Sequence, residues 1–404
     1  MPASADRPAF PKSFRRFLWT RLLGGTANQM LMVALAWQIY DLTGSAWDLG
    51  LVGLAQFIPA LVFTLPAGQW VDRVDRRGVL AAALACQAVA SVVLTVGSTT
   101  GFVGRGVIFA MCAVLGVARA LQMPSSQALV PALVGVEALP RAFAASSTLL
   151  KFAVIGGPVV GGLLYAFGAA VVYATCLALL IASLVYTAAL PRVAPSATAA
   201  PVSVESLMAG FTFIWRKKQV LGAISLDLFA VLLGGATALL PIYAKDILDT
   251  GPWGLGLLRA APAAGALAVG LLLAQRPLAR HVGRRMFVSV AVYGVSTVVF
   301  GLSHNFVLSF VALAIGGGAD MVSVVVRQTL VQLDTPDDMR GRVSAVNGVF
   351  IGASNELGEF RAGTMAAVMG PIAAVVVGGV GTLVVAALWM KAFPSLARRD
   401  RLMT

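Results

Sequence analysis

The chain has 404 residues, of which 59% are hydrophobic and only 12% are charged, and its mean hydropathy is +0.88. A soluble domain carries about 25% charged residues, so this composition excludes a water-soluble globular protein and indicates an integral membrane protein. The formal net charge of +13 would suit nucleic-acid binding, but most of the basic residues fall in the connections between apolar stretches, which excludes that class as well.

The apolar stretches are long enough to be helices that cross a bilayer. Residues 152–191 and 362–390 contain no charged residue, and each exceeds the roughly 20 residues that a spanning helix needs. A membrane β-barrel would show alternation with polar residues instead. The sequence predicts twelve spans, at 17–40, 46–71, 79–99, 104–123, 143–167, 169–190, 220–243, 252–274, 286–303, 306–327, 343–368 and 370–392.

The distribution of Lys and Arg predicts the orientation of these spans. If the N-terminus lies in the cytoplasm, most of the basic residues fall in cytoplasmic segments, whereas only Arg105, at the edge of the fourth span, and Lys245 fall on the other side. Cytoplasmic connections carry an excess of Lys and Arg, so both termini are expected in the cytoplasm. The first apolar run is too long for a signal peptide, and we expect it to be retained.

The sequence also repeats itself weakly after about 200 residues, since residues 47–51 recur as residues 253–257. Each half then holds six spans that begin on the same membrane face, which is a parallel repeat about an axis along the membrane normal. We expect an N-terminal bundle at 1–190, a cytoplasmic linker with a short interfacial helix at 191–219, and a C-terminal bundle at 220–404.

Ionisable residues inside the predicted spans are the first candidates for a functional site. A charged side chain in the middle of a span costs about 2.5–3.5 kcal/mol on the insertion scale, so these residues are expected to face one another or a hydrated cavity. Ten of them, away from the span ends near Asp48 and Arg105, are taken as candidates: Arg21, Arg119, Lys151, Asp227, Arg259, Asp320, Arg327, Glu356, Glu359 and Arg361.

The eleventh span carries two carboxylates, Glu356 and Glu359, which are three residues apart and therefore share a face of the helix. Two nearby carboxylates repel when both are ionised, so one of them is expected to hold a proton, as a reversible proton carrier must. The alternative is that they pair with Arg361, Lys151 or another basic residue and only stabilise the bundle.

Opposite charges also occupy related positions in the two halves. Arg119 and Asp320 lie at equivalent positions of the fourth and tenth spans, while Arg21 and Asp227 lie in the cytoplasmic halves of the first and seventh. Such charges could form a salt bridge between the halves that opens and closes, or a static pair. Arg327 lies near a cytoplasmic span end, and we expect its charged end to reach water.

The loop between the second and third spans has the spacing of a latch. Gly68 lets two helices approach closely, and Asp72 can accept bonds from the N-terminus of another helix, for which the eleventh span is the expected partner. With Arg73, Arg76 and Arg77, these residues are predicted to hold the cytoplasmic side shut, with Arg21 and Arg119 assigned to the same gating set. The alternative is a charged loop that only sets topology.

The fifth span contains a Gly-Pro cluster at residues 156–162. Pro158 removes a backbone donor, while Gly157 and Gly161 thin the helix. We expect a bend and a tight helix contact there.

Over its full length the chain resembles the major facilitator superfamily. The loop at 68–77 is similar to the first signature of that superfamily, although Asp75 stands where glycine is common, and residues 156–162 are similar to its antiporter signature. The strings at 335–343 and 352–363 resemble the enterobactin-exporter branch, whose neighbours are macrolide-efflux proteins, as does the string at 37–45.

This resemblance implies a major facilitator fold of two six-helix bundles, and proton-driven export of a siderophore or amphiphilic drug across a bacterial inner membrane by alternating access. The expected partners are a small-molecule substrate, protons and membrane lipids, with no nucleic acid, metal or other cofactor, and the chain is expected to act as a monomer. The predicted cavity residues are Asn28, Gln29, Lys151, Asp227, Asp320, Glu356, Glu359 and Arg361.

Two alternatives remain open from the sequence: a broad multidrug or lysolipid transporter, and a membrane receptor that transports nothing. An enzyme is not expected, because the chain contains no Gly-x-x-x-x-Gly-Lys phosphate loop and no His-Glu-x-x-His metal motif. The three cysteines, Cys86, Cys112 and Cys176, all lie in apolar spans and are expected to be packing residues.

Overall fold

The computed structural model describes residues 10–193, 204–276 and 280–400, with the side chains of 65–73 and 204–207 outside the described part. Helices make up almost all of these residues, and no strand occurs among them. The long helices are α1 (Lys12–Thr43), α2 (Ala46–Arg73), α3 (Arg76–Thr100), α4 (Arg105–Leu133), α5 (Leu139–Tyr165), α6 (Ala169–Ala188), α8 (Lys218–Gly234), α10 (Gly251–Gln275), α11 (Val282–Leu302), α12 (Phe306–Asp334), α13 (Asp337–Met369) and α14 (Pro371–Ala392).

Shorter elements join or extend them: η1 (Val136–Ala138), α7 (Val204–Arg216), η2 (Thr237–Leu239), α9 (Leu240–Ile242), η3 (Tyr243–Ile247) and α15 (Pro394–Ala397). The elements α8, η2, α9 and η3 together form one candidate membrane span, Lys218–Ile247. The prediction of an all-α integral membrane fold with twelve long helices is confirmed in the described part of the chain.

Ten spans in the described residues are long and apolar enough to cross a membrane, and two long helices, α1 and α13, do not meet the same measure. Their polar content explains the difference, because α1 contains Arg21, Asn28 and Gln29, while α13 contains Glu356 and Glu359. Polar residues in spanning helices face the interior of a bundle. The weak hydropathy of α1 and α13 therefore indicates that they line the interior of the molecule.

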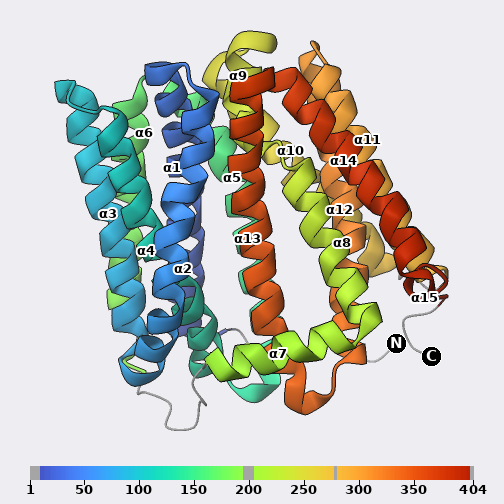
Figure 1. The fold of residues 1–404 in the computed structure, drawn as a ribbon. Helices are drawn as coiled ribbons and strands as arrows, with labels where there is room; N and C mark the ends of the chain where they lie inside the picture. Colours follow the sequence, from blue (N-terminus) through green and yellow to red (C-terminus); the bar gives the residue numbers. More distant parts are fainter. Residues whose placement is uncertain (1–9, 194–203, 277–279, 401–404) are drawn as a thin grey trace, which may run out of the picture.

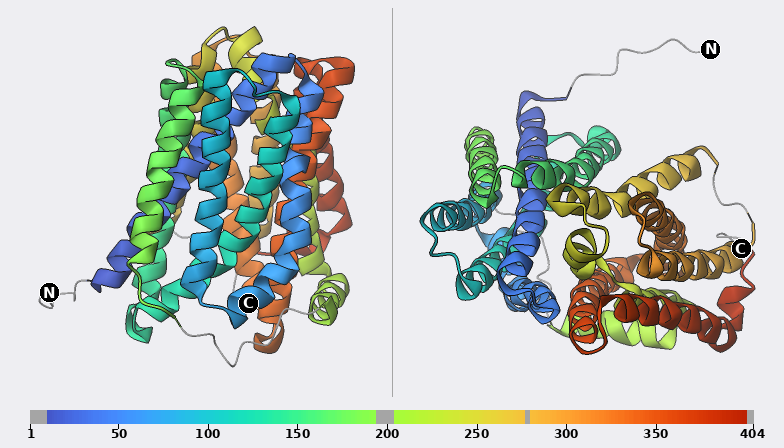
Figure 2. Two further views of the ribbon diagram at one scale, coloured as in Figure 1. Left: turned by 90° about the vertical axis from the view of Figure 1, so that its left-hand side faces the viewer. Right: turned by 90° about the horizontal axis from the view of Figure 1, so that it is seen from above.

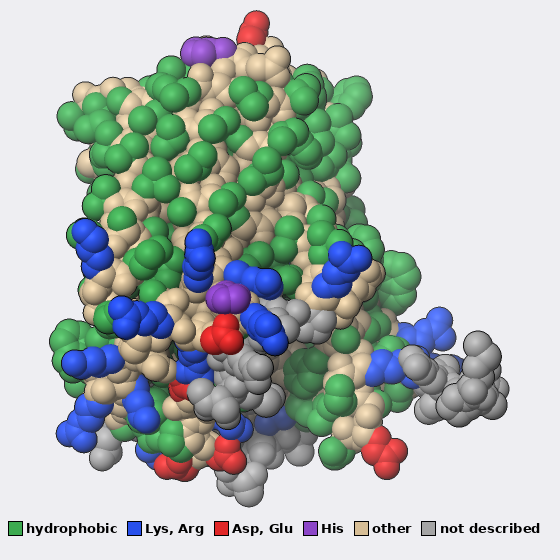
Figure 3. All heavy atoms as spheres, turned by 90° about the vertical axis from the view of Figure 1, so that its right-hand side faces the viewer, with side chains coloured by type: hydrophobic (Ala, Val, Ile, Leu, Met, Phe, Trp, Pro, Cys, Tyr) green, Lys and Arg blue, Asp and Glu red, His purple; other side chains and the backbone are tan. Residues whose placement is uncertain are grey.

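The long helices form two groups (Figures 1 and 2). Helices α1 to α6 pack on one another, helices α8 to α14 do the same, and α7 lies across one end of the molecule against α13 and α8. On the face in Figure 3, Lys and Arg gather toward that end, and a hydrophobic surface covers the rest. We call the end that holds α7 and α15 the basic end, and the other the opposite end.

Exposed apolar side chains cover the outer surfaces of both groups. Val89 of α3 is 59% exposed, Val185 of α6 is 63% exposed, and Leu388 of α14 is 54% exposed. These side chains suit contact with lipid acyl chains, since a soluble protein would bury such long stretches of apolar surface.

Glycines allow the closest approaches between the two groups. A Cβ built on Gly363 of α13 would lie 2.6 Å from the Cα of Gly50 in α2, and one built on Gly162 of α5 would lie 2.5 Å from the carbonyl oxygen of Pro252 in α10. All four residues lie within about two turns of the helix ends at the opposite end. The groups are therefore in tight backbone contact near the opposite end.

Candidate functional site

Charged residues from both groups meet between α4 and α13. Nη1 of Arg119 lies 2.6 Å from Oε1 of Glu356, in an ion pair that joins the two groups. The Arg119 side chain is 53% exposed, whereas that of Glu356 is only 12% exposed. An arginine in the middle of a spanning helix does not face lipid, so its exposure indicates hydrated space between the groups.

The second carboxylate of α13 lies in the same place, and we call these residues the central cluster: Arg119, Glu356, Glu359 and Arg259. Glu359 interacts electrostatically with Glu356, Arg259 and Arg119. A Cβ built on Gly53 of α2 would lie 3.4 Å from Oε2 of Glu359 and 3.5 Å from Oε2 of Glu356. Because glycine has no side chain at this position, both carboxylates fit against the backbone of α2.

A longer-range electrostatic attraction between the groups acts from α5 to α12, without an ion pair among the described residues. Asp320 interacts with Lys151, whose side chain is exposed, and Tyr293 of α11 lies in the field of Asp320. The N-terminal group thus supplies the cations Arg119 and Lys151, and the C-terminal group supplies the carboxylates that face them. Opposite charges attract each other, so these residues favour the approach of the two groups.

The pairing differs from the symmetric pair considered in the sequence. Arg119 binds Glu356 rather than its symmetry equivalent Asp320, and Asp320 faces Lys151 instead. Equivalent positions in a parallel repeat are related by rotation about the central axis, so two such residues need not face each other. Arg21 is half-buried and forms no ion pair within the described residues.

Asp227 and Arg327 form a buried ion pair inside the C-terminal group. Arg327 of α12 is 2% exposed and Asp227 of α8 is 6% exposed, and their charged ends are in direct contact. The expectation that Arg327 reaches water is wrong, because a carboxylate on the neighbouring helix neutralises its charge. Asp227, predicted as a cavity residue, makes this local contact instead of one with Arg21.

Changing Asp227 to Asn is expected to destabilise the fold strongly, because it leaves the Arg327 charge buried without a counter-charge. Breaking a buried pair costs about 3–5 kcal/mol, which should lower the midpoint of thermal unfolding in detergent. The matched control is Asp337→Asn, which removes the exposed partner of Arg340 at 2.6 Å and should cost only about 0–1 kcal/mol. Equal shifts in the two variants would contradict a buried pair.

Arg361 lies at the broken part of the seventh span. Its Nε donates a hydrogen bond of 2.8 Å to the carbonyl oxygen of Leu232, and its Nη2 donates one of 3.4 Å to that of Gly235. Because α8 ends at Gly234, its last carbonyl groups lack helical partners, and a cation there is favourable. Arg361 thus stabilises the end of α8, and its predicted contact with substrate stays a prediction.

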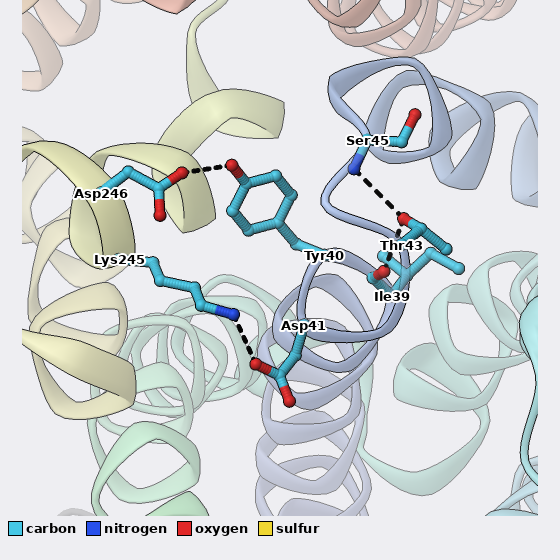
Figure 4. A network of polar contacts seen from close by, with 7 residues as sticks. All are labelled: Ile39, Tyr40, Asp41, Thr43, Ser45, Lys245 and Asp246. Carbon is cyan, nitrogen blue, oxygen red and sulfur yellow. Dashed lines mark hydrogen bonds and ion pairs between the residues drawn. The ribbon is translucent and has the colours of Figure 1, made fainter.

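Four residues join the two groups at the opposite end (Figure 4), and we call them the opposite-end network: Tyr40, Asp41, Lys245 and Asp246. The hydroxyl of Tyr40 donates to a carboxylate oxygen of Asp246, and Nζ of Lys245 lies 2.5 Å from Oδ1 of Asp41. Tyr40 and Asp41 lie in the last turn of α1, and Lys245 and Asp246 lie in the π-helical turn η3.

The sequence prediction did not include this network. A signal was available, because Ile39-Tyr40 of the first span corresponds to Ile242-Tyr243 of the seventh in the internal repeat. Symmetry-related ends of these two spans meet near the axis between the halves, where charged residues can pair. Arg259, a member of the central cluster, was recognised as an ionisable residue but was not assigned to the cavity.

The Gly-Pro cluster of α5 makes contacts on two sides. A Cβ built on Gly157 would lie 2.7 Å from Cβ of Gln29, and one on Gly161 would lie 3.1 Å from Cα of Met30, both in α1. Toward the other group, a Cβ on Gly256 of α10 would lie 2.4 Å from the carbonyl oxygen of Pro158. The predicted tight contact is therefore present, and the predicted bend at Gly157, Pro158 and Gly161 stays a prediction.

Two further predicted cavity residues, Asn28 and Gln29, are both half-buried in α1. The packing of Gln29 against Gly157 places it at the boundary between α1 and α5. Neither residue makes a side-chain hydrogen bond within the described residues, so both remain candidates for contact with substrate.

The described latch residues of the loop, Arg76 and Arg77, and the neighbouring Asp75 make hydrogen bonds within the N-terminal group. Oδ1 of Asp75 accepts hydrogen bonds from the backbone N–H groups of Arg77 and Val193. Nη1 of Arg76 donates to the carbonyl oxygen of Ala128, and Nη1 of Arg77 donates to that of Leu190. The predicted contact with the eleventh span was assigned to Asp72 and stays a prediction. The side chains of the remaining latch positions, Gly68, Asp72 and Arg73, lie outside the described residues.

Comparison with known proteins gives a family match over nearly the whole chain. Residues 4–401 match the model of a family described as transmembrane secretion effectors. Curated relatives include an enterobactin exporter of Escherichia coli O1:K1, which is 28% identical over 393 residues and is matched over 96% of this chain and 93% of its own length. An enterobactin exporter of Shigella dysenteriae serotype 1 is 26% identical over 381 residues, with coverage of 93% and 90%.

Solved structures show the same fold at low sequence identity. A bacterial homologue of the iron transporter ferroportin in an inward-facing state superposes with a TM-score of 0.69 at 16% identity, over 97% of this chain and 100% of that one. A mutant of the nucleoside transporter NupG gives a TM-score of 0.74 at 14% identity, with coverage of 95% and 100%.

Proposed function

We propose that this chain, which belongs to the family of transmembrane secretion effectors and has the major facilitator fold, exports a siderophore or an amphiphilic organic molecule in exchange for protons. It is a multi-pass protein of the bacterial inner membrane, and its relatives are membrane transporters, not enzymes. We infer that the basic end faces the cytoplasm, since Lys and Arg concentrate on that side of membrane proteins.

The observation that carries the proposal is the ion pair between Arg119 and Glu356 beside a second carboxylate, Glu359. A proton that enters from the periplasm and neutralises one of these two carboxylates lowers their combined charge and weakens their attraction for Arg119. The attraction between the two groups then changes with the protonation state. A transporter that exchanges protons for substrate requires such a dependence, because it must couple proton binding to the equilibrium between its two states.

The contacts between the groups support a state that is open to the cytoplasm. The opposite-end network and the glycine contacts hold the groups together at the proposed periplasmic end. Arg119 and Lys151 meanwhile remain exposed near the middle of α4 and α5. Substrate would enter this state from the cytoplasm, and rocking of the two groups about the central cluster would release it on the other side.

The charges favour an anionic substrate over a cationic one. The two exposed charged side chains between the groups, Arg119 of the central cluster and Lys151 of α5, are cations, whereas Glu356 is nearly buried. Anionic or catecholate groups would pair with these cations when a substrate displaces the carboxylates. The named substrate of the curated relatives, enterobactin, is a siderophore, which agrees with this choice.

Transport into inside-out proteoliposomes tests the proposal. With an acidic lumen, a catecholate siderophore or an amphiphilic anion should accumulate inside, and a protonophore that collapses the gradient should abolish the accumulation. Faster movement of an amphiphilic cation or a lysolipid would favour the broad multidrug or lysolipid alternative. Binding of the same compounds without any movement would favour a receptor and would contradict transport.

A further inference from the structure

A groove of about 880 Å³ lies at the basic end, where α7, the start of α8 and the chain around α15 come together. Its lining includes five basic residues: Arg216, Lys217, Lys218, Arg398 and Arg399. The positive-inside rule requires basic residues on this face of the membrane, but it does not require them to gather around one depression.

The carboxylates in the groove are already engaged. Asp334 accepts two hydrogen bonds from Arg399, of 2.6 Å and 2.9 Å, and Gln219 accepts one of 2.6 Å from the same guanidinium. Asp400 accepts a hydrogen bond from the backbone N–H of His281. These contacts hold the floor of the groove together, and the Arg399 guanidinium neutralises the charge of Asp334.

Four exposed cations remain around that floor: Arg216, Lys217, Lys218 and Arg398. No ion pair joins any of them to a carboxylate within the residues that the structure describes. Their charge is therefore available to an external anion.

A helix N-terminus opens into the same groove. Helix α8 begins at Lys218 and runs for 17 residues, and the side chain of Lys217 at its N-cap position makes no capping hydrogen bond. The first N–H groups of a helix lack intrahelical partners, and together with the helix dipole they favour a bound phosphate or other anion.

Apolar residues beside the groove indicate what carries that anion. On α7, Met208 is 57% exposed, Phe211 is 39% exposed and Trp215 is 64% exposed, while Ile214 is buried against α8 and α13. A short amphipathic helix with an exposed tryptophan lies at the level of the lipid headgroups. An anion held at residues 216–218 would thus have acyl chains next to α7.

We propose that this groove is a binding site for the headgroup of an anionic phospholipid, such as phosphatidylglycerol or cardiolipin. The phosphate diester lies against the start of α8 and pairs with Lys218 and Arg398, and the acyl chains cover Phe211 and Trp215. A free phosphate ion would use the cations but not the apolar face of α7, which is why the lipid is the favoured source.

Native mass spectrometry of the full-length protein in detergent tests this site, with added phosphatidylglycerol, cardiolipin or phosphatidylcholine as probes. Changing Lys218 and Arg398 together to Gln should weaken binding of the two anionic lipids by about thirtyfold, since each basic residue near a membrane surface contributes about a fivefold step in affinity. The matched control is Lys12→Gln with Arg15→Gln, which removes two exposed basic residues from the basic end outside the groove.

Three outcomes decide the matter. Loss in the groove variant alone supports the site, and so does a smaller loss in Trp215→Ala with the charges intact. An equal loss in the control variant would show that lipid binding depends only on the total charge of the basic end, and would overturn the proposal. Displacement of the anionic lipid by millimolar inorganic phosphate, with no effect of Trp215→Ala, would overturn the choice of a lipid.

Discussion

A protein with Gln at both 356 and 359 is expected to bind substrate but to lose all transport that depends on a pH gradient. Both carboxylates lie beside Arg119 and face each other across one turn of α13. Glutamine keeps their size and much of their hydrogen bonding but cannot exchange a proton. Gradient-driven uptake into proteoliposomes should fall to the rate measured without a gradient.

The design needs a control for loss of charge and a second assay. Glu137→Gln changes an exposed glutamate in η1 and should leave gradient-driven uptake unchanged. Exchange of labelled for unlabelled substrate needs no net proton movement, so it should persist in the double variant. Undiminished gradient-driven uptake in the double variant would remove Glu356 and Glu359 from proton coupling.

Changing Gly162 to Val is expected to prevent closure at the periplasmic end and to stop transport. A Cβ at Gly162 would lie 2.5 Å from the backbone oxygen of Pro252 and 3.0 Å from the Cα of Gly256. Because backbone atoms cannot rotate away, the two helices must separate. Overpacking costs about 1–3 kcal/mol, which changes the ratio of closed to open periplasmic ends by about fivefold to 150-fold.

Spin labels at Thr100 and His304, exposed residues of the two groups at that end, would report the separation. The distance between them should increase in Gly162→Val, in a background without the three native cysteines. Gly156→Val is the matched control on α5, because a Cβ there meets no atom within 4 Å. An unchanged distance distribution in Gly162→Val would contradict closure through this glycine contact.

The membrane fold could be predicted from composition and span length alone, because apolar runs of this length have few other structural solutions. Hydropathy served less well for α1 and α13. Polar residues such as Asn28 and Glu359 lower the apolar character of these helices, and the same residues show that the helices face the interior. Charged residues and hydropathy together therefore indicate which helices face the interior, which neither property indicates alone.

The presence of charges inside the spans was predictable, but most of their partners were not. Residue spacing placed Glu356 and Glu359 on one face of one helix, because that depends only on helical periodicity. The pairing of Glu356 with Arg119, and of Asp227 with Arg327, depends on how helices rotate and pack against one another. One sequence does not specify those rotations, so it did not indicate that Arg119 pairs with Glu356 in this structure and not with Asp320.

The contacts of the opposite-end network could not be predicted from the sequence either. Asp41 and Lys245 lie in connections that the sequence placed on the same face of the membrane, yet their contact depends on how closely the two groups approach. The glycines that permit that approach, Gly50 and Gly162, face partners that no local motif identifies. The internal repeat was the only sequence feature that related the two ends of the network.

The central claim is that the charged residues of α4, α5 and α13 face water between the two groups and not lipid. A cysteine in place of Gly352 tests it most directly, because this position lies one turn from Glu356 on the same face of α13 and has open space around it. The control is a cysteine in place of Val89, which is exposed on the outer surface of α3. Both variants are made in a background that lacks the native cysteines.

A membrane-impermeant thiol reagent added from the cytoplasmic side is predicted to modify the cysteine at 352 rapidly and to leave the one at 89 unmodified. When Gly162→Val is added, the cysteine at 352 should react more slowly with reagent from the cytoplasmic side and faster with reagent from the periplasmic side. A cysteine at 352 that stays unreactive from both sides would show that this face of α13 meets lipid or packed protein, and would contradict the account.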